Sequence, residues 1–146
     1  MTPDTEMQAA VCNCLALRQA ARHVSRFYDQ CLAPTGLRTT QFSVLAKLKR
    51  LGPMTINTLA GELVMDRTTL GRAMLPLQRD GLIQVESGAQ DKRSKELQLT
   101  QAGARRIDDA LAIWRRAQRR FEAEFGEKRA SNLRNELRAV VASELA

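Results

Sequence analysis

The sequence is poor in the side chains on which most enzyme sites depend. Its 146 residues include one histidine and three cysteines, with no Gly-rich phosphate loop, no Ser-His-Asp set and no metal-ligand spacing. Cys12 and Cys14 do not make a zinc pair by themselves, because the other ligands of a zinc site are missing. We therefore expect no catalytic residue, no metal and no cofactor, and we do not expect an enzyme.

Aromatic residues and long apolar runs are also scarce. Four phenylalanines, one tyrosine and one tryptophan argue against an aromatic platform that stacks bases. No stretch approaches the ~20 apolar residues of a membrane span, and no basic region followed by an apolar run opens the chain. Cys12 and Cys14 would point to different faces of a helix, so we expect reduced thiols rather than a disulfide framework. Together these features predict a soluble cytoplasmic protein.

Basic residues are in excess. Twenty-three Lys and Arg residues stand against sixteen Asp and Glu residues, which gives a net charge of +7. Such an excess favours a polyanionic partner, although many basic proteins have none. The length allows one domain with a real core, or two small lobes that share one.

Residues 66–80 carry the first specific signal. Asp66 is placed to accept hydrogen bonds from the free N–H groups that begin a helix. Apolar residues then recur at helical spacing and predict one buried stripe of Leu70, Ala73, Met74 and Leu77. Donors occupy the opposite face near the helix start, namely Arg67, Thr68, Thr69 and Arg72. This arrangement suits the major groove of DNA, but an ordinary amphipathic surface helix has the same pattern.

The segments before this stretch predict a helix-turn-helix. Residues 39–51 form a periodic helix whose inward positions are Phe42, Leu45, Leu48 and Leu51. Thr55 can cap a short helix over residues 56–62, and Asp66 opens the next helix four residues later. Two helices joined by so tight a turn, the second with donors at its start, form a helix-turn-helix. Gly81 ends the second helix.

Two short alternating segments follow and predict a β wing. Residues 82–86 and 96–99 alternate as strands do, and a polar basic turn joins them. Arg93 at the tip is placed for a minor groove, whose narrow A·T-rich form favours arginine. Asp91 is expected to brace Arg93 or Lys92 across the turn. A solvated charged hairpin is the competing interpretation.

The remaining segments are long amphipathic helices. Residues 1–6 are polar and expected to fray, and residues 7–33 contain nothing that breaks a helix. Residues 101–125 begin at the cap Thr100, and residues 127–145 form a last helix after a glycine. These helices carry more apolar face than one small lobe can cover, so burial in a two-fold homodimer is expected. We assign a solvated face without a DNA role to Arg105, Arg106, Arg115, Arg116, Arg119 and Arg120.

The predicted fold class is mainly α with a small β wing. It combines a winged helix-turn-helix lobe with a lobe in which the terminal helices dimerise. Residues 1–36 are expected to form the N-terminal dimerisation helix and residues 37–100 the DNA-binding lobe. Residues 101–146 are expected to form the C-terminal dimerisation helices.

The order of these elements resembles the MarR family of bacterial transcription regulators over nearly the whole chain. The most specific match is Asp91-Lys92-Arg93-Ser94-Lys95, followed by Leu97-Gln98-Leu99-Thr100 and Gly103. The other matching segments are Leu37-Arg38-Thr39-Thr40-Gln41-Phe42, Leu59-Ala60, Asp66-Arg67-Thr68-Thr69-Leu70, then Leu75 and Leu77, and Asp80-Gly81-Leu82-Ile83. The resemblance implies a winged helix-turn-helix homodimer on a pseudo-palindromic operator of double-stranded DNA. It further implies a repressor whose DNA binding is loosened by a ligand or an oxidant.

Positions carried over from the family define the expected DNA contacts. The resemblance places Arg93 in the minor groove. It places Arg67, Thr68, Thr69 and Arg72 in the major groove, with Lys92, Ser94 and Lys95 on phosphates. Pro76 departs from the commoner pattern, because a proline inside a helix deletes the hydrogen bond to the carbonyl four residues earlier and usually kinks the helix.

One expected effector is a small organic anion, such as an aromatic acid or a phenol. Its pocket between the dimer helices and the DNA-binding lobe would need a cation or donor and apolar walls. Arg22 is as basic a candidate as the sole histidine. The residues predicted to form the pocket are Arg18, His23, Thr39, Thr40, Phe42 and Trp114.

The alternative input is an organic peroxide, which one branch of the family senses through a cysteine near the start of the first helix. Cys14 falls near that position, and Tyr28 matches a tyrosine of that branch. The other tyrosines do not recur, since Arg18 and Thr39 stand in the corresponding region. Arg18 would favour the reactive thiolate, whereas a small buried apolar cysteine is the competing interpretation. A non-catalytic protein-interaction module, the alternative from a different class, leaves the Arg-Thr-Thr face and the basic wing unexplained.

Overall fold

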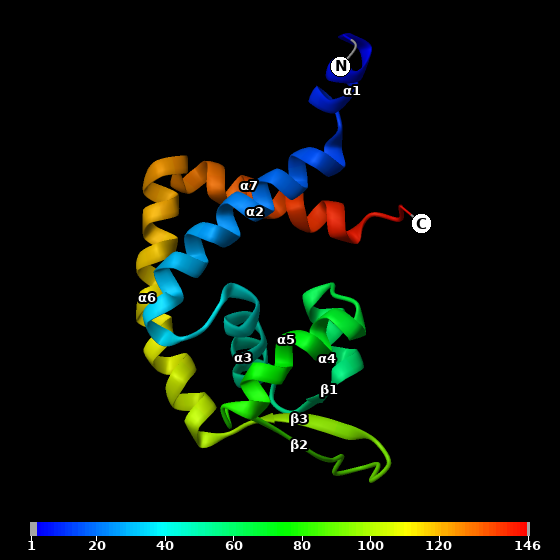
Figure 1. Cartoon of the computed structure of the whole chain (residues 1–146), viewed down its shortest axis with the longest axis vertical. Coiled ribbons are helices and arrows are strands. Elements are labelled where there is room, and N and C mark those ends of the chain that lie inside the picture. The colour runs from blue at the N-terminus through cyan, green and yellow to red at the C-terminus, as the bar shows by residue number, and fades with distance from the viewer. Residues whose placement is uncertain (1–2, 146) are drawn as a thin grey trace.

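The structure, a computed structural model, describes residues 3–145 and is mainly helical with a small antiparallel sheet (Figure 1). This confirms the predicted mainly α fold with a small β wing. The chain begins with α1 (Pro3–Ala10), α2 (Asn13–Leu32), the 3-10 turn η1 (Ala33–Thr35), α3 (Thr39–Leu51), β1 (Met54–Thr55) and α4 (Ile56–Leu63). It continues with α5 (Arg67–Arg79), β2 (Ile83–Ser87), β3 (Lys95–Leu99), α6 (Gln101–Phe125) and α7 (Glu127–Ala142).

Side-chain caps set the starts of three consecutive helices. The hydroxyl of Thr55 accepts a hydrogen bond from the backbone N–H of Thr58 at 3.2 Å, which begins α4. Asp66 caps α5, and the hydroxyl of Thr100 accepts from the N–H of Gly103 at 3.0 Å to begin α6. The three predicted caps are therefore confirmed.

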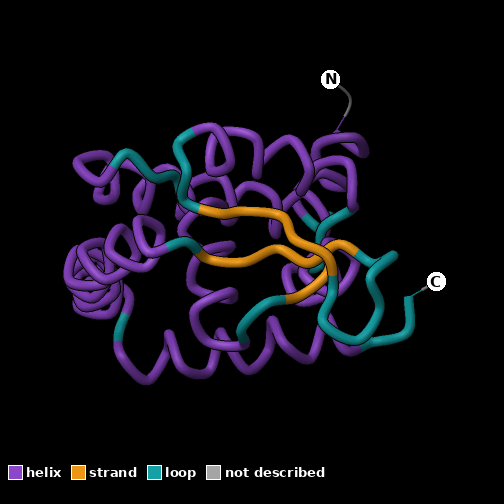
Figure 2. Tube along the Cα trace, turned by 90° about the horizontal axis from the view of Figure 1, so that it is seen from below, coloured by secondary structure: helices purple, strands orange, loops and turns teal. Residues whose placement is uncertain are grey.

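The sheet contains one strand that the sequence pattern did not predict. β3 lies between β1 and β2, and both pairs are antiparallel. Figure 2, which shows the molecule from below relative to Figure 1, shows the strands side by side. Leu97 of β3 faces Val85 of β2 and Met54 of β1 in register. β1 is two residues long, too short to show the alternation that predicts a strand.

One hydrophobic core unites the helix-turn-helix with the first half of α6. Leu45 of α3, Leu70 of α5 and Ile107 of α6 are fully buried in it. A Cβ atom added at Gly103 would lie 2.0 Å from the carbonyl oxygen of Leu82, so α6 starts directly against the backbone that leads into β2. α6 then runs away from this core and carries α7 across the upper part of the molecule, below α1 in the view of Figure 1. No helix within residues 3–145 combines the length and the hydropathy of a bilayer span.

The N-terminal helix differs from its prediction in two ways. The chain is already helical from Pro3, and the single helix expected over residues 7–33 is divided at Val11 and Cys12. Cys12 has an extended backbone, with φ −75° and ψ 111°, and its Sγ accepts from the N–H of Leu15 at 3.4 Å. A cysteine is an unusual N-cap, and no glycine or proline marks the break, so the helical pattern concealed it.

Four smaller expectations concern the ends of helices and the exposure of single side chains. Leu51, expected to face inward, is 48% exposed at the end of α3. The last helix ends at Ala142 rather than residue 145, because the hydroxyl of Ser143 bonds back to the carbonyl of Val140 at 2.5 Å. Arg106, expected on the solvated face, is half-buried and donates from Nη1 to the carbonyl of Thr35 at 3.0 Å. α5 continues through Pro76 to its predicted end.

Candidate nucleic-acid interface

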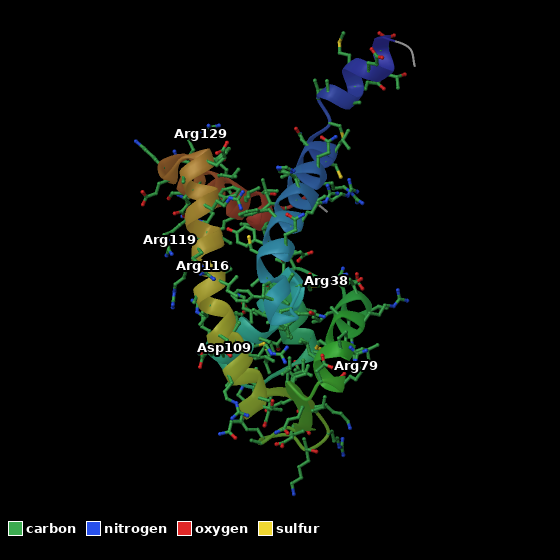
Figure 3. The ribbon with its side chains drawn as sticks, turned by 60° about the vertical axis from the view of Figure 1, so that its left-hand side comes forward. Arg38, Arg79, Asp109, Arg116, Arg119 and Arg129 are labelled. Atoms are coloured by element: carbon green, nitrogen blue, oxygen red, sulfur yellow. The ribbon has the colours of Figure 1, made fainter. Side chains whose placement is uncertain are left out.

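α5 exposes a face that is separate from the one it buries. Thr68, Arg72 and Arg79 lie at helical spacing on the exposed face, and Leu75 lies among them. Figure 3 shows Arg79 on the opposite side of the molecule from Arg116 and Arg119 of α6. The buried stripe holds Leu70, Met74 and Leu77, and Ala73 is half-buried, which agrees with the predicted amphipathic division of this helix.

Asp66 caps the start of α5 and accepts the hydroxyl hydrogen of Thr69. Its carboxylate accepts from the backbone N–H of Thr69 at 2.8 Å and from the Thr69 hydroxyl at 2.6 Å. The side-chain and backbone hydrogen bonds from Thr69 lower the pKa of Asp66. Because its hydrogen is committed to Asp66, the Thr69 hydroxyl can offer only lone pairs to a partner. Thr68 keeps a hydroxyl free of this cap.

The turn between α4 and α5 is tight. Val64 takes the left-handed conformation with φ 53°, and the N–H of Met65 bonds to the carbonyl of Ala60 at 2.9 Å. A β-branched residue rarely adopts a positive φ, and Val64 does so where the main chain bonds back to the end of α4. The turn thereby places the donor-bearing start of α5 directly after α4, as the predicted helix-turn-helix requires.

The hairpin of β2 and β3 presents basic side chains on a braced loop. Asp91 accepts from the backbone N–H of Arg93 at 2.9 Å, so it braces the loop through the main chain rather than through a charged group. The hydroxyl of Ser94 donates to the carbonyl of Asp91 at 2.8 Å. Lys92, Arg93 and Lys95 are exposed and form no ion pair with the residues that the structure describes. Their charges are therefore available to a phosphate backbone.

A cavity of about 450 Å³ lies between α2, α3 and α6. The rings of Phe42 and Trp114 stack on its wall, with centroids 6.1 Å apart and planes 13° apart. Tyr28 donates its hydroxyl hydrogen to Oε1 of Gln118 at 2.5 Å, and burial raises the pKa of Tyr28. The further residues that line the cavity are Val24, Ser25, Leu32, Thr39, Ser43, Ala46, Lys47, Arg50 and Leu63.

A second cavity of about 300 Å³ lies between the start of α3 and α5. Thr40 and Thr69 line it, and Thr39 lines both cavities. The N–H of Thr39 donates to Asp29 at 2.7 Å, whereas its hydroxyl oxygen is buried without a partner among the described residues. A bound ligand or water could supply that missing hydrogen bond.

The structure brings only some of the predicted effector residues together. Thr39, Phe42 and Trp114 share the larger cavity. Arg18 and His23 are exposed on α2 and are not among the residues that line either cavity. The cations at the larger cavity are Lys47 and Arg50, which the sequence analysis missed. Their spacing from Phe42 and Thr39 along one helix was the signal that could have identified them.

The cysteines lie apart from both cavities. Cys12 and Cys14 are exposed at the start of α2, and Cys31 near its end is half-buried. The competing interpretation of Cys14 was a small buried apolar cysteine. Cys14 is exposed in this protomer, so the protomer alone does not bury it.

Comparison with known proteins identifies the fold and the family. The MarR family model matches residues 37–95. The HTH-type transcriptional regulator YwoH of Bacillus subtilis (strain 168) is 31% identical over 93 residues, which cover 64% of this chain and 67% of YwoH. The transcriptional regulator MosR of M. tuberculosis, solved in complex with DNA, is 36% identical with a TM-score of 0.77, covering 92% of this chain and 99% of that chain.

A more distant structure has the same fold. BpsR of Bordetella bronchiseptica, whose DNA binding is regulated by 6-hydroxynicotinic acid, is 17% identical with a TM-score of 0.82 and covers 92% of this chain and 96% of that chain. At this identity the likeness concerns the fold alone. The capped α5, the braced basic wing and the matches to YwoH and MosR agree, and this chain belongs to the MarR family of DNA-binding transcriptional regulators.

Proposed function

We propose that the protein is a homodimeric, sequence-specific repressor that binds a pseudo-palindromic operator and leaves it when a small aromatic acid or phenol binds. The observation that carries the DNA-binding part is the exposed face of α5 beside the unpaired basic wing. Both are built on a buried core, so their geometry is set before DNA arrives.

The proposed contacts follow from the chemistry of each side chain. Arg67, Thr68, Thr69 and Arg72 face base edges in the major groove, where arginine pairs with guanine through two hydrogen bonds. Arg93 enters the adjacent minor groove. Lys92, Ser94 and Lys95 contact phosphates and position the lobe without reading sequence.

Arg72→Ala tests the major-groove contact. We expect specific binding to weaken by roughly 1–3 kcal/mol if Arg72 reads a base edge, with little change on random DNA. Fluorescence anisotropy on a duplex selected from a random pool by the wild-type protein measures both. Arg119→Ala on α6 is the matched control, because Arg119 lies on the other side of the molecule (Figure 3). Equal losses on selected and random DNA would assign Arg72 to a phosphate instead.

The proposed homodimer rests on apolar faces that this protomer leaves exposed. Val11 precedes α2 and is 71% exposed, and Leu17 lies on α2 itself. The exposed apolar residues of α7 and its C-terminal extension are Leu133, Leu137, Val140, Val141 and Leu145. Single exposed leucines are common, but several exposed apolar residues on the terminal helices support an interface there. A two-fold axis would bury both sets and present two α5 helices to two half-sites.

The proposed effector site is the larger cavity. Phe42 and Trp114 supply a flat apolar wall that suits an aromatic ring. Arg50 is exposed at the cavity and has no ion-pair partner among the described residues, whereas Lys47 is paired with Glu62 at 3.3 Å. Arg50 is therefore the cation that we assign to the acid group. The cavity joins α2 to α3, so a ligand that prefers one arrangement of these helices would shift the spacing of the two lobes.

A panel of aromatic acids and phenols that includes 6-hydroxynicotinic acid tests this site by calorimetry and by release of the protein from selected DNA. We expect Arg50→Ala to weaken the binding of an acid by about 1.5–3 kcal/mol through loss of a charged hydrogen bond. Arg18→Ala and His23→Ala are the matched controls, because both residues lie outside the cavity. Weakened binding in these controls, with Arg50→Ala unaffected, would move the site to the face of α2.

Peroxide sensing by Cys14 is the second candidate function, and the exposure of this thiol favours it. A peroxide would oxidise the thiolate to a sulfenic acid and leave as an alcohol or water. We expect Cys14→Ser to keep its DNA affinity after peroxide treatment while the wild type loses affinity. Peroxide-induced release that persists in Cys14→Ser would contradict this function, and Cys31→Ser is the control.

A further inference from the structure

Gly71 stands in the middle of α5, where glycine is a poor choice for helix stability. Its backbone is ordinary helix, and a Cβ atom built at this position would meet nothing within 4 Å. Packing within the protomer therefore does not require a glycine here. Glycine also serves where a helix backbone must come close to a ligand, and this position borders the exposed face of α5.

Leu75 lies one helical turn after Gly71 and is 60% exposed. At 100° per residue, Gly71, Leu75 and Thr68 fall on adjoining strips of the helix surface, and Arg72 borders them on the other side. Because Gly71 has no side chain, no side chain covers the leucine from the position four residues earlier. Gly71 and Leu75 therefore form a small apolar surface on a face of α5 that otherwise carries hydrogen-bond donors.

We propose that Gly71 and Leu75 together contact the 5-methyl group of a thymine in the operator. This inference rests on the proposed entry of α5 into the major groove and names one base type that the helix reads there. Of the four bases, only thymine presents a methyl group in that groove, and the other edges present hydrogen-bonding groups. A leucine pressed against those groups would remove their water without replacing it. Against a methyl group, the same contact buries apolar surface on both sides.

Gly71 allows a close approach between α5 and the DNA, and Leu75 supplies the apolar surface for the contact. The bare backbone at Gly71 lets the groove wall approach α5, and the leucine side chain then covers the methyl group. Thr68 and Arg72 remain free for hydrogen bonds to neighbouring base edges. The helix therefore reads one apolar and several polar features side by side.

The first test separates this role from a structural one by measuring stability and DNA affinity in the same variants. Gly71→Ala is expected to raise the melting temperature, because alanine favours a helix, and to weaken binding to the selected duplex at least threefold. Gly61→Ala in α4 is the matched control, since a Cβ atom there also meets nothing within 4 Å. It should raise the melting temperature and leave binding unchanged. Unchanged binding in Gly71→Ala would overturn the proposal.

The second test removes the methyl group itself. Each thymine of the selected duplex is replaced in turn by uracil, which lacks only the 5-methyl group. At one position of each half-site, replacement by uracil should lower the affinity of the wild type about threefold to fivefold, which is the effect of one buried methyl group. The same replacement should not lower the affinity of Leu75→Ala, because this variant already lacks the contact. Leu51→Ala, which removes an exposed leucine at the end of α3, should respond as the wild type does.

The outcomes distinguish this inference from the function on which it rests. If Leu75→Ala weakens binding equally on every uracil-substituted duplex, the leucine contacts the sugar-phosphate backbone and the methyl contact is wrong. If Arg72→Ala weakens specific binding while Gly71→Ala and Leu75→Ala do not, the inference fails and the proposed major-groove contact stands. If none of these three variants alters binding, the contact of α5 with DNA fails as well.

Discussion

The helices of the winged lobe cover their apolar faces within one chain, whereas the terminal helices α2 and α7 leave apolar side chains exposed. α3 buries Phe42, Val44, Leu45 and Leu48 in 13 residues. Among described residues, α2 fully buries only Leu32 and α7 only Ala130, although they span 20 and 16 residues. A helical period therefore predicts that a face needs cover, but it does not say which chain provides the cover.

This difference assigns different tasks to the two regions. The winged lobe has a closed core, which holds the backbone of α5 and of the two strands of the wing, where the proposed DNA contacts lie. The terminal helices keep exposed apolar surface, and its burial at about 25 cal/mol per Å² is available to drive association. We infer that the first region reads DNA and the second sets the spacing between two readers. The cavity beside Phe42 and Trp114 lies where α2 meets the winged lobe.

The largest effect should come from the core of the winged lobe. Leu45→Ala is expected to lower the free energy of unfolding by about 2–5 kcal/mol, because it leaves a cavity among fully buried neighbours. Urea denaturation at several protein concentrations measures this loss. Since Leu45 is covered within the protomer, the loss should be the same at every concentration. A loss that appears only at high concentration would contradict the closed core of this lobe.

The terminal helices should respond to concentration instead. Leu137, on α7, is 38% exposed, and Leu137→Asp would bury a charge in the proposed interface. We expect the dissociation constant of the dimer to rise about tenfold or more in sedimentation experiments. Leu75→Asp, an exposed leucine outside the terminal helices, should leave that constant unchanged. A wild-type protein that is monomeric at all concentrations would contradict the proposed dimer.

A smaller effect is expected at the wing. Arg93→Ala removes a positive charge from the loop that Asp91 braces, while the backbone hydrogen bond to Asp91 remains. Affinity should fall on all DNA sequences, and the slope of log affinity against log salt should decrease in magnitude by about two, roughly one for each wing of the proposed dimer. Anisotropy titrations between low and moderate salt give both values. Arg119→Ala should match the wild type, and an unchanged slope in Arg93→Ala would remove the wing from the interface.

The smallest effect concerns the acid limit of stability. Hydrogen bonds from Thr69 lower the pKa of Asp66 below its unfolded value of about 3.9. The stabilisation is therefore fully present above that value and is lost as the pH falls through the lower pKa of the folded state. Asp66→Asn keeps a good cap but cannot titrate, so its melting temperature should fall less than that of the wild type below pH 4. If the melting temperatures of the two proteins fall in parallel below pH 4, the titration of Asp66 contributes nothing to the loss of stability in acid.

The sequence alone determined the starts of α4, α5 and α6 and the order of the helix-turn-helix and wing. Thr55, Asp66 and Thr100 act on backbone groups within three or four residues, so local sequence contains the whole interaction. The family resemblance was correct for the same reason, since its motifs are local runs. The candidate DNA contacts on α5 and the wing were proposed from those runs.

Only the tertiary structure decided which residues meet across the chain. The pairing of β1 with β3, the break of the N-terminal helix at Cys12 and the cavity beside Arg50 depend on residues far apart or on a weak cap. The cation assigned to the effector moved from Arg18 and His23 to Arg50, because only Arg50 of these three residues lines the cavity. Sequence periodicity gives the face of each helix, whereas packing decides what that face meets.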